Sequence, residues 1–353
     1  MSRPAAPTPP HRPGTATIWA ALWAVYIIWG TTYLAIRVVN ETLPPLLSAS
    51  FRFLVAGALM YAWTIRRGDR EGDRPGKRQW TAAAIVGTLL ILGGNGGVVW
   101  AEKTIPSGVA ALLVALVPLW MALLDRLFFG GHLRGRAIVG LVAGFGGAAL
   151  LLGAEASGDV DLVGMLFVVG ASLSWATGSL WSRTAPLPAR PFVGVGMEML
   201  AGGVALAIAG ILAGELGQID VSSFSRASIL GLLYLIVFGS WIGFSAYLWL
   251  LRVARTSLVS TYAYVNPVVA VFLGWAFLDE QVGVRTLVAG GIVVASVALI
   301  ISAGGARRED DLELERLEEG GAGVEGDLAL ERVGDAEQEG LAEDRRGQLD
   351  PDG

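Results

Sequence analysis

The sequence predicts an all-α integral membrane protein with ten transmembrane helices, arranged as two inverted five-helix repeats. The composition, the number of apolar runs and the repetition of one segment support this fold class. Of the 353 residues, 54% are hydrophobic and only 16% are charged, whereas soluble domains carry about 25% charged residues. The 48 glycines also suit membrane helices, because small residues let their backbones approach closely.

Ten apolar runs are long enough to be membrane helices. A helix needs about 20 apolar residues to cross about 30 Å of hydrocarbon, and short polar or Pro- and Gly-containing breaks separate the runs. We predict helices at 18–39, 46–65, 80–101, 106–124, 136–153, 162–182, 191–213, 228–250, 256–278 and 285–303. The short break from Glu102 to Ile105 indicates a tight antiparallel hairpin.

The two ends of the chain differ from its body. The first 17 residues hold five prolines and no apolar run, which predicts a disordered cytoplasmic lead over 1–17 rather than a signal peptide. From Arg307 to Gly353 there are 17 acidic and 6 basic residues and no aromatic one. Such a segment cannot bury enough apolar surface to fold, so we predict a disordered acidic cytoplasmic tail over 304–353.

Basic residues concentrate in alternate connections between the predicted helices. Arginines and lysines in short loops remain on the cytoplasmic side of a membrane. The second, fourth, sixth and eighth connections carry them: Arg66, Arg67, Arg70, Arg74, Lys77, Arg78, Arg126, Arg134, Arg136, Arg183, Arg190, Arg252 and Arg255. The odd connections carry at most one or two each. This alternation predicts a multi-pass protein of the inner (plasma) membrane with both termini in the cytoplasm.

One segment occurs twice. Trp29-Gly-Thr-Thr-Tyr-Leu-Ala-Ile-Arg37 recurs 146 positions later as Trp175-Ala-Thr-Gly-Ser-Leu-Trp-Ser-Arg183, with Trp, Thr, Leu and Arg at matching places. The register continues: Phe51–Gly57 matches Met197–Gly203 at 146, Trp100 and Pro118 match Trp249 and Pro267 at 149, and Gly140 matches Gly290 at 150. The interval encloses five spans, so the repeats 18–153 and 162–303 must have opposite orientations. Secondary transporters have this layout and bind substrate between the halves.

Two charged residues lie at equivalent positions inside the predicted helices. Arg52 and Glu198 each lie about seven residues into a helix, where a charge costs about 2.5–3.5 kcal/mol on insertion scales. Their helices run in opposite directions, which argues against a direct pair. Each either lines a pathway or is accommodated locally, Arg52 by extending to the outer face and Glu198 by pairing with a loop arginine such as Arg190.

Several further residues are candidates for substrate contact. Pro118 and Pro267 are near midspan, and each frees the carbonyl four residues earlier, which produces either a simple kink or a binding position for a ligand. Near Pro267 lie Tyr262 and Asn266. The midspan aromatics Trp29, Tyr33 and Trp175 either form an apolar cage or pack in the core.

Two polar residues lie nearer the helix ends. Asn95 has glycines at 93, 94, 96 and 97, which predicts a locally weak helix whose amide contacts substrate or a neighbouring helix. Glu102, at the outer mouth, is either an interfacial charge or a proton-binding group. Glu198 is the other candidate for proton coupling.

Motifs of soluble enzymes are absent from the sequence. We find no P-loop, G-x-S-x-G elbow or H-E-x-x-H pair. The chain has no cysteine, and its two histidines, His11 and His132, lie outside the predicted helices. We therefore expect no metal site, no cofactor, no nucleic-acid partner and no ATPase activity, so that transport would follow a gradient.

Six stretches resemble the EamA-type drug/metabolite transporter family, and within it the YedA-like bacterial inner-membrane members. They are Tyr26-Ile-Ile-Trp-Gly-Thr-Thr-Tyr33, Pro44-Pro-Leu, Arg52-Phe-Leu, Gly94-Asn-Gly, Pro106-Ser-Gly-Val-Ala-Ala111 and Ser260-Thr-Tyr-Ala-Tyr-Val-Asn-Pro-Val-Val-Ala270. The resemblance covers roughly 18–303. It implies two EamA repeats and export of small metabolites or drugs, without specifying the substrate.

We expect, therefore, a non-enzymatic secondary transporter that exports amino-acid-like or amphipathic drug-like solutes by alternating access. It would be embedded in the bilayer and able to act as a monomer or a homodimer. The expected substrate contacts are Trp29, Tyr33, Arg52, Asn95, Trp175, Glu198, Tyr262 and Asn266. The alternative is a membrane-embedded enzyme or scaffold acting on lipid head groups, which would need a cluster of His, Asp or Glu at one interface. An ion channel would need a ring of equivalent polar residues.

Overall fold

A computed structural model of the chain describes residues 14–67, 75–128, 130, 135–155, 161–254, 256–259 and 261–302. The predicted acidic tail, 304–353, lies outside the described residues, and so do residues 1–13 of the predicted lead. The first helix begins at Thr15, three positions before the predicted start.

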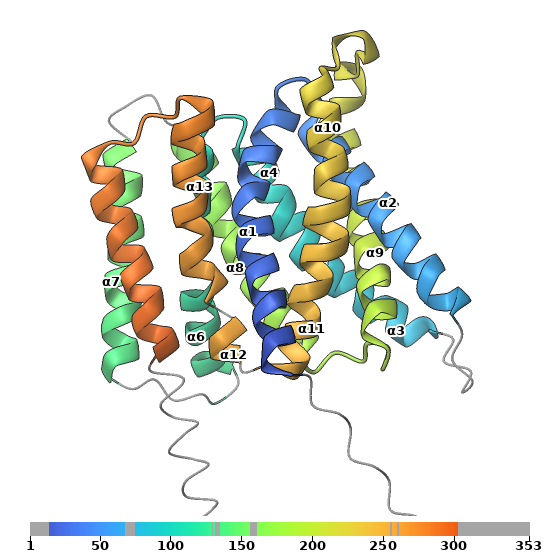
Figure 1. The fold of residues 1–353 in the computed structure, drawn as a ribbon, viewed down its shortest axis with the longest axis horizontal. Coiled ribbons are helices and arrows are strands. Elements are labelled where there is room, and N and C mark those ends of the chain that lie inside the picture. Colours follow the sequence, from blue (N-terminus) through green and yellow to red (C-terminus); the bar gives the residue numbers. More distant parts are fainter. Residues whose placement is uncertain are drawn as a thin grey trace, which may run out of the picture. The chain divides into compact units, whose positions relative to one another are not determined.

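The predicted fold class is confirmed: the described residues form helices and turns, and no strand occurs among them (Figure 1). Within that part of the chain, nine helices are long and apolar enough to cross a membrane, and a tenth apolar helix, Tyr262–Leu278, is shorter. Their bounds are within a few residues of the predicted ones. The tenth is shorter because its predicted span, 256–278, is interrupted before Tyr262.

The first half contains five spans. They are α1 (Thr15–Asn40), α2 (Pro45–Arg66), a third span built from α3 (Lys77–Gly87), the π-helical segment η1 (Thr88–Gly96) and α4 (Gly97–Ala101), a fourth built from α5 (Ser107–Val114) and α6 (Val117–Phe128), and α7 (Gly135–Glu155). Proline at the first position of α2 is favourable, because that backbone nitrogen has no helical partner.

The second half repeats this order. It contains α8 (Leu162–Ser182), α9 (Pro191–Leu212), the 3₁₀ turns η2 (Glu215–Gln218) and η3 (Val221–Ser223), and an eighth span of α10 (Arg226–Tyr234), the π-helical segment η4 (Leu235–Phe244) and α11 (Ser245–Val253). α12 (Thr256–Val259) and α13 (Tyr262–Leu278) follow, and the last helix is Val284–Ser302.

The two π-helical segments lie at equivalent positions. Adding the repeat interval of 149 to η1 gives 237–245, which overlaps η4. The sequence predicted only a weak helix around Asn95. The structure shows a more specific deviation, a wider helical turn that is rare and often found at functional sites.

Helix packing joins the halves. We call the face where α1 begins the lower face and the face where it ends the upper face (Figure 1). α2 crosses α9 at two equivalent glycines: a Cβ at Gly57 would lie 3.0 Å from the backbone nitrogen of Leu200, and one at Gly203 would lie 3.1 Å from that of Leu54. The two helices therefore pack with their backbones almost in contact.

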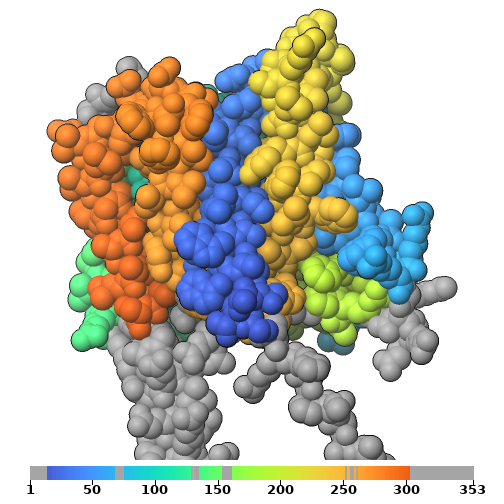
Figure 2. Space-filling model, viewed as in Figure 1, coloured from blue at the N-terminus to red at the C-terminus, as the bar shows by residue number. Residues whose placement is uncertain are grey.

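In the space-filling view, α1 lies between α13 and the α10–α11 span, and side chains fill most of the gaps seen between the ribbons (Figure 2). On α1 the side chains of Trp23 and Ile27 are 56% and 57% exposed. In a membrane such apolar side chains face lipid.

Two carboxylates from the second half hold helix ends of the first half at the upper face. Glu215 accepts hydrogen bonds from the backbone nitrogens of Leu46 (3.2 Å) and Leu47 (2.9 Å), at the start of α2. Glu280, after α13, accepts from the backbone nitrogens of Ser107 (2.8 Å) and Gly108 (3.2 Å), at the start of α5. A helix N-terminus has free N–H groups and a partial positive charge, so both carboxylates stabilise the helices and connect the halves.

Candidate functional site

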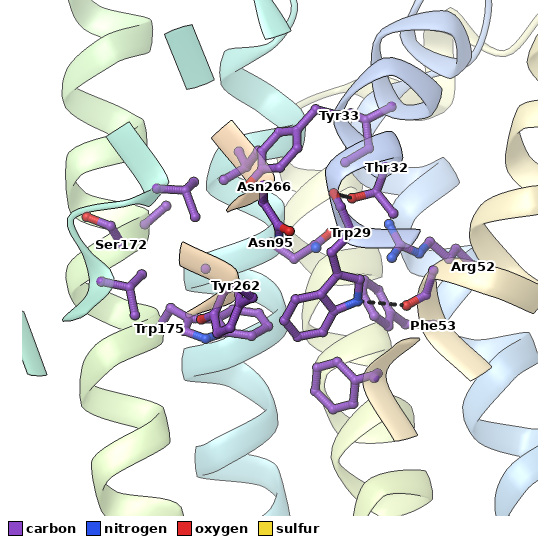
Figure 3. Close-up of a pocket in the computed structure, with 18 residues that line it drawn as sticks. Trp29, Thr32, Tyr33, Arg52, Phe53, Asn95, Ser172, Trp175, Tyr262 and Asn266 are labelled. Carbon is purple, nitrogen blue, oxygen red and sulfur yellow. Dashed lines mark hydrogen bonds between the residues drawn. The ribbon is translucent and has the colours of Figure 1, made fainter. Parts of the chain in front are cut away.

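A cavity lies between the two halves at the middle of the helices (Figure 3). It contains about 680 Å³ of space not filled by protein atoms. Both halves contribute to its wall: Trp29, Thr32, Tyr33, Ile36, Arg52, Phe53, Gly94, Asn95, Val98, Val114 and Val117 from the first, and Ala171, Ser172, Trp175, Gly239, Phe244, Tyr262 and Asn266 from the second. The site therefore depends on the association of the repeats.

Aromatic rings form the end of the cavity nearer the lower face. Trp29 and Trp175, the equivalent tryptophans of the repeated segment, make an edge contact with their ring centroids 6.0 Å apart. Trp29 also contacts the rings of Phe244, Tyr247 and Tyr262, at centroid distances of 6.4, 4.9 and 5.3 Å. One helical turn below Trp29, the hydroxyl of Tyr26 contacts that of Thr261. We call Trp29, Trp175, Phe244, Tyr247 and Tyr262 the aromatic layer.

Arg52 supplies the only charged side chain of the cavity wall among the described residues. Its side chain is 4% exposed, so it does not extend to the outer face. Its Nε donates to Ser240 Oγ at 2.7 Å, and the guanidinium lies over the Phe53 ring, 4.7 Å from the centroid. Its Nη1 has no hydrogen-bond partner within the part of the chain that the structure describes.

Two asparagines face the same space. Asn95 projects from η1 and Asn266 from α13, and in the view of Figure 3 Asn95 lies between Arg52 and Asn266. The buried Oδ1 atoms of both have no hydrogen-bond partner among the described residues. Both Oδ1 atoms are therefore placed to accept a hydrogen bond from a bound solute.

Pro118 and Pro267, unlike the asparagines, do not line the cavity. Pro118 lies just after the break between α5 and α6, and both Val114 and Val117 line the cavity. Pro267 lies inside α13, next to Asn266. Each therefore shapes a helix beside the cavity without itself lining it.

Two further hollows lie on opposite sides of the cavity. The upper hollow shares Ile36 and Arg52 with the cavity and continues along α1 to Asn40. The lower hollow lies at the other face and contains Glu198 and Arg183. No described residue belongs to both the cavity and the lower hollow.

The hollows are built from equivalent positions. The repeat intervals of 146 and 149 relate six residues of the upper hollow to six of the lower one. The pairs are Ile36 and Ser182, Val39 and Ala185, Ser48 and Gly194, Ala49 and Val195, Arg52 and Glu198, and Val99 and Leu248. The inverted repeat thus produces one hollow at each face, with opposite charges at the equivalent position.

Glu102 does not behave as an exposed interfacial charge. Its side chain is fully buried, and neither carboxylate oxygen has a hydrogen-bond partner among the described residues. Arg37 donates to its backbone oxygen rather than to its carboxylate. Burial and the nearby carboxylate of Glu280 raise the pKa of Glu102 well above its usual range, against a smaller opposing effect of Arg37.

The structure thus brings together seven of the eight residues predicted from the sequence as substrate contacts. Glu198, 3% exposed, lines the lower hollow instead. The sequence interpretation missed Thr32, Ser240, Phe244 and Tyr247. The contribution of the eighth span to the site could have been inferred from its equivalence to the third span, since Gly243 corresponds to Gly94 at the interval of 149.

Comparison with known proteins gives the family. The model of the EamA-like transporter family matches residues 16–153 and 162–302, once in each half. This chain belongs to the EamA-like transporter family. As a member of this family it is a membrane transporter of small molecules, which agrees with the resemblance found in the sequence.

Relatives extend across bacteria and plants. The uncharacterized inner membrane transporter YedA of Escherichia coli (strain K12) is 41% identical over 286 residues, covering 80% of this EamA-family chain and 90% of the relative. A WAT1-related chloroplastic protein of Arabidopsis thaliana is 24% identical, covering 81% of this chain and 70% of the relative. A solved crystal structure aligns with a TM-score of 0.59 at 22% identity, covering 81% of this chain and 98% of the other; this agreement concerns the fold alone.

Proposed function

We propose that this protein is a secondary transporter that exports small amphipathic solutes by alternating access. The observation that carries the proposal is the stacking of three spaces: a central cavity lined by both halves, and an equivalent hollow toward each face. An inverted repeat can exchange two such hollows by rocking one half against the other around a fixed site.

The basic loops support an assignment of the two faces. Arginine-rich connections lie at the lower face, so the lower face would be cytoplasmic and the upper hollow would open to the outside. The cavity shares Ile36 and Arg52 with the upper hollow, and the aromatic layer lies on the other side. This arrangement corresponds to a state whose central site faces outward through a narrow opening.

A proton gradient would supply the energy. Glu198 in the lower hollow and the buried Glu102 near the upper face are the two carboxylates placed to bind a proton on opposite sides of the cavity. An exporter that exchanges solute for protons would load a proton from outside and release it inside.

Cysteine labelling tests alternating access directly, because the natural chain has no cysteine. Ala49→Cys places a thiol in the upper hollow, and Val195→Cys places one at the equivalent position of the lower hollow. Glu215→Gln weakens the connection between α2 and α9 at the upper face. It should raise the labelling rate of Ala49→Cys by an impermeant maleimide in right-side-out vesicles, and lower that of Val195→Cys in inside-out vesicles.

The control is Glu41→Gln, which removes an exposed carboxylate at the same face and should change neither rate. Rates that rise together, or a change at one site alone, would rule out alternating access and favour a channel or a static scaffold.

A further inference from the structure

The described wall of the cavity contains a positive charge and no negative one. Arg52 is 4% exposed, and no Asp or Glu belongs to the described wall. A buried charge without a counter-charge strongly destabilises a folded protein. The charge is therefore retained against a stability penalty, and such penalties are typical of residues kept for function.

The guanidinium has a fixed position and a free edge. Nε is held by Ser240 Oγ, and Gly239 leaves room for the group, because a Cβ there would lie 3.0 Å from Arg52 Nη2. Trp29 Nε1 donates to the backbone oxygen of Gly239 at 3.3 Å, which holds this part of η4 against α1. Nη1, which has no hydrogen-bond partner among the described residues, remains available for an anion.

The other residues of the cavity wall indicate which further groups the solute would carry. The free Oδ1 atoms of Asn95 and Asn266 accept hydrogen bonds, so they suit a hydroxyl, amide or ammonium group. Four rings of the aromatic layer, those of Trp29, Trp175, Phe244 and Tyr262, line the cavity and give it a mostly apolar surface. A guanidinium binds carboxylates through parallel N–H···O bonds better than any other side chain.

We propose that Arg52, held by Ser240, is the anion-binding group of the central site, and that the solute is a small carboxylate with a hydrogen-bond donor and an apolar ring or branched body. The carboxylate supplies the counter-charge that the described cavity wall lacks, Asn95 and Asn266 accept from the donor, and the aromatic layer contacts the apolar body. This inference rests on the proposed transport function and specifies its substrate class.

Three probes with one phenyl body and different charges test this: 3-phenylpropionate, 3-phenylpropanamide and 3-phenylpropylamine. Thermal unfolding of the purified full chain is measured with each, because a ligand that binds the folded state raises the melting temperature. We expect a concentration-dependent rise with the carboxylate and a much smaller one with the amide and the amine.

The variants separate binding from stability. Arg52→Gln should lose the carboxylate-dependent rise, yet the empty variant should melt at the same temperature as the natural protein or higher, because a buried charge has been removed. Arg52→Lys should keep part of the rise. Gly239→Ala, which displaces the guanidinium, should weaken it, and Arg66→Gln, an exposed arginine of the same helix, should leave it unchanged.

Two outcomes overturn the anion site: a carboxylate response in the natural protein no larger than that of the amide or amine, or an unchanged response in Arg52→Gln. Failure of the transport proposal is distinct from both. If the response depends on Arg52 but preloaded proteoliposomes show no counterflow of radiolabelled 3-phenylpropionate, the anion site stands and the transport proposal fails.

Discussion

The upper and lower hollows are made by the same positions of the two repeats, and their differences show what the repeat does not dictate. Where the upper hollow has Arg52, the lower one has Glu198, and where the upper one has Ile36, the lower one has Ser182. The upper hollow contains about 210 Å³ of unfilled space and the lower one about 1150 Å³. Equivalent backbone positions thus give two hollows of different charge and unfilled volume.

This difference separates the role of the shared helix framework from the role of the side chains in each hollow. Duplication supplies the helices and their crossing, which must match if the halves alternate as proposed above. The side chains of each hollow are free to diverge, and under the same proposal one would hold an anionic solute and the other a proton. The following predictions test where the two halves are equivalent and where they are not.

The largest effect is expected at the crossing of α2 and α9, where the halves should be equivalent. Gly57→Val and Gly203→Val each force side-chain atoms against backbone of the opposite helix, and overpacking of this kind costs about 3 kcal/mol. Both variants should lower the melting temperature and the yield of folded protein by similar amounts.

Gly170→Val is the matched control, because nothing lies within 4 Å of a Cβ at this exposed glycine. If one of the two crossing glycines tolerates valine, the halves do not pack equivalently and the symmetric account of the crossing fails.

The next effect distinguishes Arg52 from Glu198, where the halves should differ. Glu198→Gln should abolish the pH dependence of uptake into proteoliposomes and leave solute exchange intact. Arg52→Gln should keep the pH dependence and weaken solute affinity about 10- to 100-fold, the value of one charge-assisted hydrogen bond. Unchanged pH dependence in Glu198→Gln would exclude it as the coupling residue.

Glu102 gives a pH effect on stability. Its pKa is raised in the folded protein, so the neutral form is favoured there, and the contribution of this group to stability is greatest at low pH and declines as pH rises from about 4.3 toward the folded pKa. Glu102→Gln should flatten this decline and raise the melting temperature at neutral pH. Each unit by which folding raises the pKa of Glu102 corresponds to about 1.4 kcal/mol in the free energy of unfolding.

The groups that face Glu102 are Tyr33, Arg37 and Glu280. Thermal unfolding of Glu102→Gln and the natural protein, measured between pH 4 and pH 8, checks the prediction. Parallel curves would show that Glu102 does not titrate between the folded and unfolded states.

The smallest effect compares the equivalent tryptophans. Trp29 contacts the four other rings of the aromatic layer, and its Nε1 donates to the backbone oxygen of Gly239. Trp175 contacts three rings of the layer, those of Trp29, Phe244 and Tyr247. Trp29→Phe should therefore destabilise the protein by about 1 kcal/mol more than Trp175→Phe. Equal losses in chemical or thermal unfolding would contradict this ranking.

The sequence was sufficient for the fold because its signals are long. Ten apolar runs and a repeat interval determine the number, order and direction of the helices. The same interval identified Arg52 and Glu198 as equivalent, and midspan position singled out Trp29, Tyr33 and Asn266. These residues lie near the cavity or its neighbouring hollow because a polar or aromatic side chain at that depth has few other favourable places.

The remainder depends on three-dimensional detail that no local pattern carries. The π-helical winding of η1 and η4 depends on packing against neighbouring helices. In the sequence, Tyr247 cannot be distinguished from a lipid-facing or interfacial tyrosine. The winding of η4 determines the direction in which the side chains of the following helix, α11, point. Glu215 and Glu280 lie in polar connections, and their roles appear only when they meet helix ends about 170 positions away in the chain. The burial of Glu102 likewise comes from residues of other spans.

The two π-helical segments also bear on the history of the chain. A π-helix accommodates an extra residue in a helical turn, so deleting one residue from η1 or η4 would restore an ordinary helix and rotate everything after it by about 100°. Asn95 or Phe244 would then leave the cavity wall. Because both halves carry this winding at the same place, the simplest history has the extra residue present in the single ancestral unit before the gene duplicated. The binding site would then be as old as the half-sized protein, which had to pair with an inverted copy of itself to complete it.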